Sequence, residues 1–150
     1  LQVAADDGFD IPSNVSWAST VADYAEATIL CGHQPFADAL LAHLRPYDSQ
    51  IATTGGVGVA GPVAYFLGAL ASLAGSFDDA DRWFDQARAI SDRLGARYFG
   101  ARTDLWWGSS YSVRGERDRS RALLDSALDV ATVEGYGDLR RRALDRLTEL

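Results

Sequence analysis

Lysine and methionine are absent from this chain of 150 residues, and cysteine occurs only once. All 14 basic residues apart from the histidines are therefore arginines, which together with abundant alanine, glycine and aspartate indicates a GC-rich genome. Without methionine, the chain is expected to be a piece of a longer translation product. The lone Cys31 excludes an internal disulfide and favours a reducing, cytoplasmic compartment. We expect it to be a small apolar residue inside a helix.

Long apolar runs are missing as well. No segment approaches the roughly 20 apolar residues that a membrane-spanning helix needs, and no signal peptide is recognisable. The sequence therefore predicts a cytoplasmic protein without membrane contact. Its hydrophobic fraction of 47% and charged fraction of 23% are typical of a folded globular chain.

Positive charge is outnumbered by negative charge, and the formal net charge is −7. Such a surface repels nucleic acid unless its basic groups are segregated. The arginines do cluster locally, but acidic residues interrupt the first cluster. We therefore expect solvated helix faces, and no direct nucleic-acid contact, at residues 114–121 and 140–142.

What the chain does contain is an internal repeat. Residues 61–96 align with residues 101–136 at a constant offset of 40 residues, so that Gly75 falls on Gly115. Within each unit, apolar residues recur at three- and four-residue steps, which predicts two helices with one buried face each. A glycine follows each predicted helix, where it accepts the left-handed conformation of a helix C-terminus.

A third, more degenerate copy precedes these two. Residues 17–31 are predicted to form one helix, Gly32 to end it, and residues 35–44 to form its partner, with an inner face of Ala37, Leu41 and Leu44. The sequence thus predicts an all-α fold, a right-handed array of antiparallel helical hairpins in one domain over residues 17–150. The expected segments are a surface-lying N-terminus at 1–16, hairpins at about 17–45, 59–95 and 97–135, and a capping helix at 137–149.

The repeat resembles a tetratricopeptide repeat lengthened to about 40 residues. Small and large apolar residues carry the resemblance at Leu67, Gly68, Ala71, Gly75, Phe77, Ala80, Phe84 and Ala87. The second unit departs from the pattern at Arg117 and Ser120, where an aromatic and a small apolar residue are typical. These departures weaken the assignment of that hairpin.

A narrower resemblance covers nearly the whole chain. It rests on the strings at residues 44–47, 61–68, 94–97 and 101–103. With these strings, the chain is similar to the C-terminal repeat region of large actinobacterial regulators of the LuxR type or the adenylate-cyclase-like type. The resemblance implies that the repeats bind or sense, while catalysis and DNA contact lie in other domains.

A literal G-x-G-x-x-G occurs at residues 56–61 and suggests a dinucleotide site. Such a site needs the glycines after a strand, a helix behind them and an acid about 20 residues further on. Only residues 50–54 could form a strand, and the candidate acids Asp78 and Asp79 fall in a turn between helices. We interpret the motif as a flexible loop that leads into a helix.

Residues with metal or catalytic chemistry are few. His33 and His43 lack cysteine or acidic partners at metal-ligand spacing, so we expect surface or cap histidines and no metal. Asp78 and Asp79 are expected to be charges at a helix N-terminus. No nucleophile signature surrounds the serines at 109–112. The sequence predicts neither a cofactor nor an enzyme.

Aromatic residues crowd the predicted helices, and core packing explains most of them. If a concave groove exists, the first helix of each hairpin should line it, at Tyr65, Ala69, Ser72, Arg102, Leu105 and Ser109. An arginine beside aromatic rings is a plausible anchor for a peptide or another domain. The predicted partners are thus other domains of the parent protein or a protein or peptide, with homo-oligomers also open. The alternative is a sensor that binds a small effector in the groove.

Overall fold

The structure, a computed structural model, describes residues 2–6, 8–9, 17–54 and 57–150. The chain divides into two compact units, Leu1–Trp83 and Phe84–Leu150. Most of the described residues are helical, as the periodicity predicts. The single domain expected over residues 17–150 stays a prediction. No helix in these described ranges is long and apolar enough to cross a membrane.

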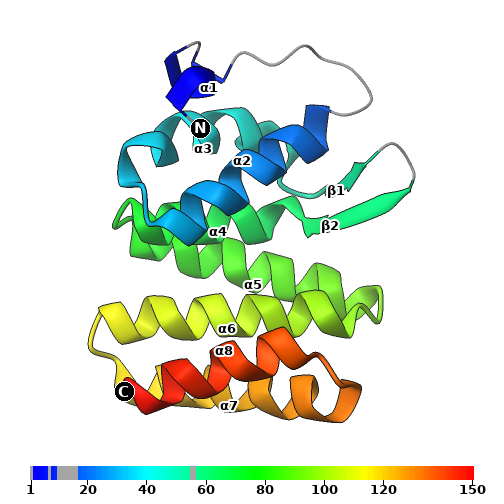
Figure 1. The fold of residues 1–150 in the computed structure, drawn as a ribbon, viewed down its shortest axis with the longest axis vertical. Helices are drawn as coiled ribbons and strands as arrows, with labels where there is room; N and C mark the ends of the chain where they lie inside the picture. Colours follow the sequence, from blue (N-terminus) through cyan, green and yellow to red (C-terminus); the bar gives the residue numbers. More distant parts are fainter. Residues whose placement is uncertain (1, 7, 10–16, 55–56) are drawn as a thin grey trace. The chain divides into compact units, whose positions relative to one another are not determined.

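The first unit is built around α4 (Val63–Leu73). Both α2 (Trp17–Cys31) and α3 (Ala37–Leu44) pack against α4 and against each other (Figure 1). The remaining elements of this unit are α1 (Gln2–Asp6), short 3-10 helices at Gln34–Phe36 and Arg45–Tyr47, the strands β1 (Ile51–Thr54) and β2 (Gly58–Pro62), and the first residues of α5 (Phe77–Arg93).

Helix α4 is buried on every side. All nine residues from Val63 to Ala71 are buried, and the helix contains no charged residue. A helix that is apolar all round belongs to a core. The spacing of apolar residues predicted only one buried face, and α4 is buried more extensively than that. In α3, by contrast, the expected inner face is shifted: Leu40 is fully buried, whereas Leu41 is only half-buried.

The glycine-rich segment before α4 is a β-hairpin, and the predicted loop and early helix start are wrong. β1 pairs antiparallel with β2, with Ala52 opposite Gly61 and Thr54 opposite Gly58. Ile51 and the threonines of β1 are β-branched residues that favour strands. Because β2 occupies residues 58–62, α4 begins only at Val63. The described glycines of the motif, Gly58 and Gly61, therefore lie in a strand and not in a phosphate-binding turn before a crossover helix. Gly56 lies outside the described residues.

Part of the segment expected to lie on the surface enters the core. Phe9 is 2% exposed, and its ring lies 5.6 Å from that of Tyr24 and 5.6 Å from that of Phe36. Nearby, His43 Nε2 lies 2.9 Å from the carbonyl oxygen of Gly8. Aromatic packing of this kind explains why Phe9 is buried. Residues 1, 7 and 10–16 of the predicted segment lie outside the described residues.

The second unit contains the C-terminal half of α5 together with α6 (Arg97–Val113), α7 (Arg117–Glu134) and α8 (Gly137–Thr148). α7 packs against α6 and α8, and α8 also contacts α6 (Figure 1). Their shared core is small-residue rich and comprises Ala101, Leu105, Leu124, Ala127, Ala131, Leu139 and Ala143. A helix is present where 137–149 was predicted, as α8, and it buries Leu139 and Ala143. Its role as the cap of a repeat array stays a prediction.

The 40-residue offset of the sequence recurs in the helix bounds. α5 spans 77–93 and α7 spans 117–134, while α4 and α6 end at residues 73 and 113. Burial repeats too, in the pairs Ala80 and Ser120, Phe84 and Leu124, Ala87 and Ala127, and Ser91 and Ala131. The departure at Ser120 is accommodated because its hydroxyl donates to the Gly108 carbonyl oxygen at 2.8 Å.

Left-handed glycines end these helices as predicted, with φ of 80° at Gly75 and 75° at Gly115. A side chain in this conformation costs roughly 1–2 kcal/mol, and a Cβ at Gly115 would otherwise meet open space. We expect Gly115→Ala to lower the free energy of unfolding by about 1 kcal/mol and Gly115→Asn to lower it by less. Urea titration followed by circular dichroism measures both. Equal losses in the two variants would contradict this backbone origin.

Candidate functional site

The second unit contains an open cavity of about 490 Å³ on one side of α6. Its wall on α6 consists of Arg97, Gly100 and Ala101. α5 and α7 supply the flanking residues, which are Arg88, Asp92, Asp129, Val130 and Val133. The cavity is thus lined by small and branched apolar side chains together with charges of both signs.

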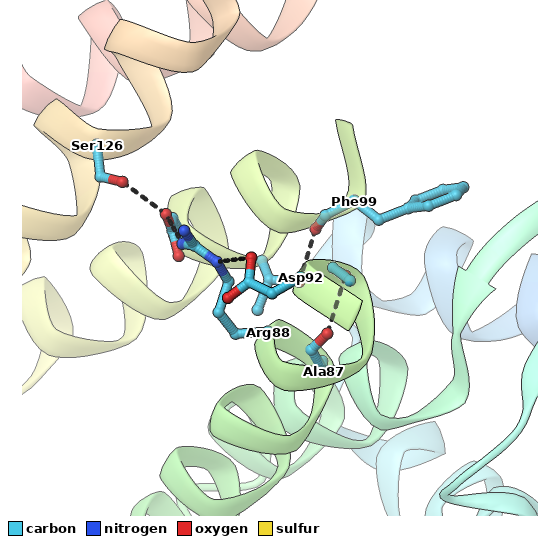
Figure 2. Close-up of polar contacts among 8 residues, drawn as sticks. Ala87, Arg88, Asp92, Phe99 and Ser126 are labelled. Atoms are coloured by element: carbon cyan, nitrogen blue, oxygen red, sulfur yellow. Dashed lines mark hydrogen bonds and ion pairs between the residues drawn. The ribbon is translucent and has the colours of Figure 1, made fainter. Parts of the chain in front are cut away.

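A buried carboxylate organises the charges beside this cavity. Arg88 Nη1 donates to Asp104 Oδ2, and Ser126 Oγ donates to the same oxygen at 2.8 Å. Arg88 Nε donates to Asp92 Oδ1 at 3.2 Å. Figure 2 shows Arg88 reaching from α5 toward Asp92 and toward the carboxylate that Ser126 also contacts. The guanidinium is held by two carboxylates and has little freedom to turn.

Burial differs sharply across this network. The Asp104 side chain is 1% exposed, that of Arg88 is 34% exposed, and that of Asp92 is 65% exposed. Asp104 Oδ1 has no hydrogen-bond partner among the described residues. The cationic member of the pair, Arg88, therefore lies at the cavity wall, whereas its counter-ion, Asp104, is buried between the helices.

The local sequence explains why Asp104 is buried. Gly100, Ala101 and Gly108 lie three or four residues from it on α6, and all three are buried. Asp104 therefore stands in the apolar stripe of its own helix. Sequence reasoning missed this residue, although a carboxylate at a core-facing position is itself a signal of a buried ionic partner.

Burial raises the pKa of the Asp104 carboxyl above its ordinary value, and the hydrogen bonds from Arg88 and Ser126 offset this only in part. For Arg88, burial lowers the pKa, but the hydrogen bonds and charges of Asp104 and Asp92 together outweigh it and the pKa is raised. Burial thus opposes the charged form of both groups, and it prevails only at Asp104, the more deeply buried of the two.

The raised pKa of Asp104 predicts a pH dependence of stability. Because the folded-state pKa of Asp104 is raised, the folded chain holds this proton more tightly than the unfolded chain does. The resulting stabilisation is complete below the ordinary pKa of 3.8 and is lost as the pH rises through the folded-state pKa. The unfolding free energy of the unmodified chain, minus that of Asp104→Asn, should therefore increase as the pH falls from 7 toward 4. Urea unfolding of both proteins across this range measures the difference. A difference that shrinks on acidification would show that the ion pair dominates burial.

The residues predicted to line a groove have different environments. Tyr65, Ala69 and Leu105 are buried in the core, where they offer no surface to a partner. The Tyr65 hydroxyl instead donates to Glu26 Oε2 at 3.4 Å. The half-buried residues of the set are Ser72, Arg102 and Ser109. None of the six lines the cavity described above.

Arg102 does lie beside aromatic rings, as predicted. Its guanidinium carbon is 5.2 Å from the ring centroid of Phe99 and 5.9 Å from that of Tyr98. Tyr98 is 41% exposed, and its ring packs edge-on against Tyr136 at 5.3 Å. These contacts hold Arg102 by cation–π attraction at the surface of the second unit. Its role as an anchor for a partner stays a prediction.

Other candidate groups have local structural partners. His33 packs against the ring of Phe36 at 4.3 Å, and Asp79, in the first turn of α5, pairs with Arg82 at 2.9 Å. Cys31 is the last residue of α2, so its predicted position in a helix is confirmed. It is exposed, however, and does not lie in an apolar environment. Across the described ranges, no three His, Cys, Asp or Glu side chains are grouped to hold a metal ion.

The arginine-rich segments form ion pairs on exposed helix faces. Arg119 pairs with Glu116 at 2.9 Å, and Asp138 receives Arg141 at 2.6 Å and Arg142 at 2.8 Å. Such pairs at three- and four-residue spacing are typical of a solvated helix surface.

Comparisons of the chain with family models, with curated proteins and with solved structures each find no match. The functional argument therefore rests on the geometry of the second unit and on the repeat.

Proposed function

We propose that this chain is a non-catalytic helical-repeat module of a larger regulator and binds a segment of a partner protein or of another domain of its parent. The open cavity carries this proposal, because three successive helices build it and internal ion pairs set its charges. Sites on helices with charges already held in place bind with less ordering cost than sites on free loops.

A tetratricopeptide-like array and a parent of the LuxR type or the adenylate-cyclase-like type, in the cytoplasm, belong to the same proposal. Support comes from the recurrence of helix ends and buried positions at 40 residues. In such arrays each hairpin leaves an apolar flank for the next hairpin to cover, which creates extended binding surfaces.

Two exposed valines allow a matched test by photo-crosslinking. Val133 lines the cavity, Val113 does not, and both are 78% exposed. We would replace each in turn with p-benzoylphenylalanine in the parent protein, irradiate cells, and identify products by mass spectrometry. The expected result is a defined product from position 133 and none from position 113, with the partner then binding the purified chain. Equal crosslinking from both positions, or no product from 133, would refute the proposal.

A small-effector sensor is the second candidate. The cavity volume of about 490 Å³ falls within the range of roughly 300–1,000 Å³ found for small-molecule sites. Thermal unfolding of the purified chain with a panel of metabolites tests this candidate, since a ligand of the folded state raises the melting temperature. A shift abolished by Val133→Arg but not by Val113→Arg would favour the sensor over the peptide-binding module.

A further inference from the structure

The charges around the cavity are unbalanced. Its lining includes the cations Arg88 and Arg97, but each is already paired. Arg88 binds the buried Asp104, and Arg97 binds Glu134 Oε1. Both positive charges of the wall are thus neutralised by carboxylates of this chain, so they are poor receptors for an anionic ligand.

Two further carboxylates line the cavity, and neither has a cation of its own. Asp92 shares the guanidinium of Arg88 with Asp104 and keeps a side chain that is 65% exposed. Asp129 is exposed and has no ion pair among the described residues. With two guanidinium groups against four carboxylates, the cavity and its immediate partners carry a net charge of −2.

Apolar surface adjoins this negative charge. Val130 is half-buried and Val133 is 78% exposed, and both line the cavity on α7 beside Asp129. A long cationic side chain matches this combination, because its methylene stem covers apolar surface while its charged end stays near carboxylates. A short side chain would leave the apolar surface uncovered, and an acidic side chain would be repelled by the carboxylates.

We infer that the cavity receives a lysine or arginine side chain from the partner segment, with the stem on Val130 and Val133 and the cationic group toward Asp92 and Asp129. This inference rests on the proposed function and names the chemistry of its partner. The negative walls also discriminate against acidic segments, since like charges in an interface are unfavourable.

The whole chain has a net charge of −7 and attracts basic peptides at any acidic position, so the test needs a charge-matched control. Asp92→Asn/Asp129→Asn removes two carboxylates from the cavity. Asp85→Asn/Asp125→Asn removes two exposed carboxylates of the same unit that do not line it. Both double variants change the net charge equally, and circular dichroism checks that both keep the fold.

The probe is an array of nine-residue peptides with random flanks and a central lysine, arginine, norleucine or glutamate. We expect the unmodified chain to bind lysine- and arginine-centred peptides about tenfold more strongly than norleucine-centred ones, the order of a well-placed charge pair. The preference should vanish in Asp92→Asn/Asp129→Asn and persist in Asp85→Asn/Asp125→Asn. Amide NMR shifts at Gly100 and Ala101 on adding a selected peptide locate the contact in the cavity.

Three other outcomes would contradict the inference. Equal loss of preference in both double variants assigns it to the overall charge of the chain and overturns the inference. Norleucine-centred peptides that bind equally well and shift Gly100 and Ala101 overturn it while leaving the peptide-binding module intact. No shift at these amides with any peptide, together with no crosslink from position 133, rejects both proposals.

Discussion

Replacing Arg88 with methionine is expected to lower the free energy of unfolding by about 3–5 kcal/mol at neutral pH, because it leaves a buried carboxylate without its counter-ion. Asp104 would retain only the hydroxyl of Ser126 as a partner at Oδ2. The converse change, Asp104→Asn, should cost only about 1–2 kcal/mol, since Arg88 is partly exposed and keeps Asp92. Urea unfolding followed by circular dichroism measures both losses.

Two further variants separate this buried pair from ordinary surface charge. Asp92→Asn breaks only the exposed contact with Arg88 and should cost less than about 1 kcal/mol. The double variant Arg88→Met/Asp104→Leu should be more stable than Arg88→Met alone, because an apolar pair removes the orphaned charge. The loss in Arg88→Met should also diminish at acidic pH, where Asp104 becomes neutral. A double variant no more stable than Arg88→Met would contradict the assignment of the cost to an unpaired carboxylate.

Alanine at two glycines of the same helix is expected to have opposite effects on stability. A Cβ at Gly108 would lie 3.0 Å from Leu124 Cγ and 3.1 Å from the Ser120 carbonyl oxygen. Since Leu124 is fully buried and the carbonyl belongs to the backbone of α7, neither yields without moving that helix. We expect Gly108→Ala to cost about 1–3 kcal/mol, the usual range for overpacking.

Gly100→Ala provides the matched control on α6. A Cβ there would lie 3.5 Å from Arg88 Nε, an ordinary contact, and alanine favours a helix interior over glycine by roughly 0.5–1 kcal/mol. The midpoint of urea unfolding should therefore rise for Gly100→Ala and fall for Gly108→Ala. If both midpoints rise, α6 and α7 are packed less closely than the structure has them.

Helix positions were largely predictable from local sequence. The helix expected at 17–31 is α2, and the glycine after it has the left-handed backbone expected there, with φ of 63° at Gly32. Apolar spacing and glycine punctuation act within a few residues of each other, so no tertiary partner is needed to recognise them. The strand β2 was missed because a short glycine- and valine-containing run carries no helical or strand period of its own and depends on β1 for its hydrogen bonds.

The candidate site was much less predictable. Tyr65 was expected at a groove because it stands on the first helix of a hairpin, yet α4 is buried on every side and Tyr65 with it. Asp104 was overlooked for the opposite reason, because a charged residue is ordinarily placed in solvent. In both cases the side chain's environment depends on neighbouring helices that are distant in sequence.

The sequence by itself determined where most helices lie and which glycines end them, since periodicity and left-handed glycines are properties of short stretches of chain. Only the tertiary structure decided which helix is enclosed on all sides, that residues 51–54 pair with residues 58–62, and which carboxylate meets Arg88. The physical reason is that burial and ion pairing depend on what another segment brings into contact, and no local pattern encodes that partner.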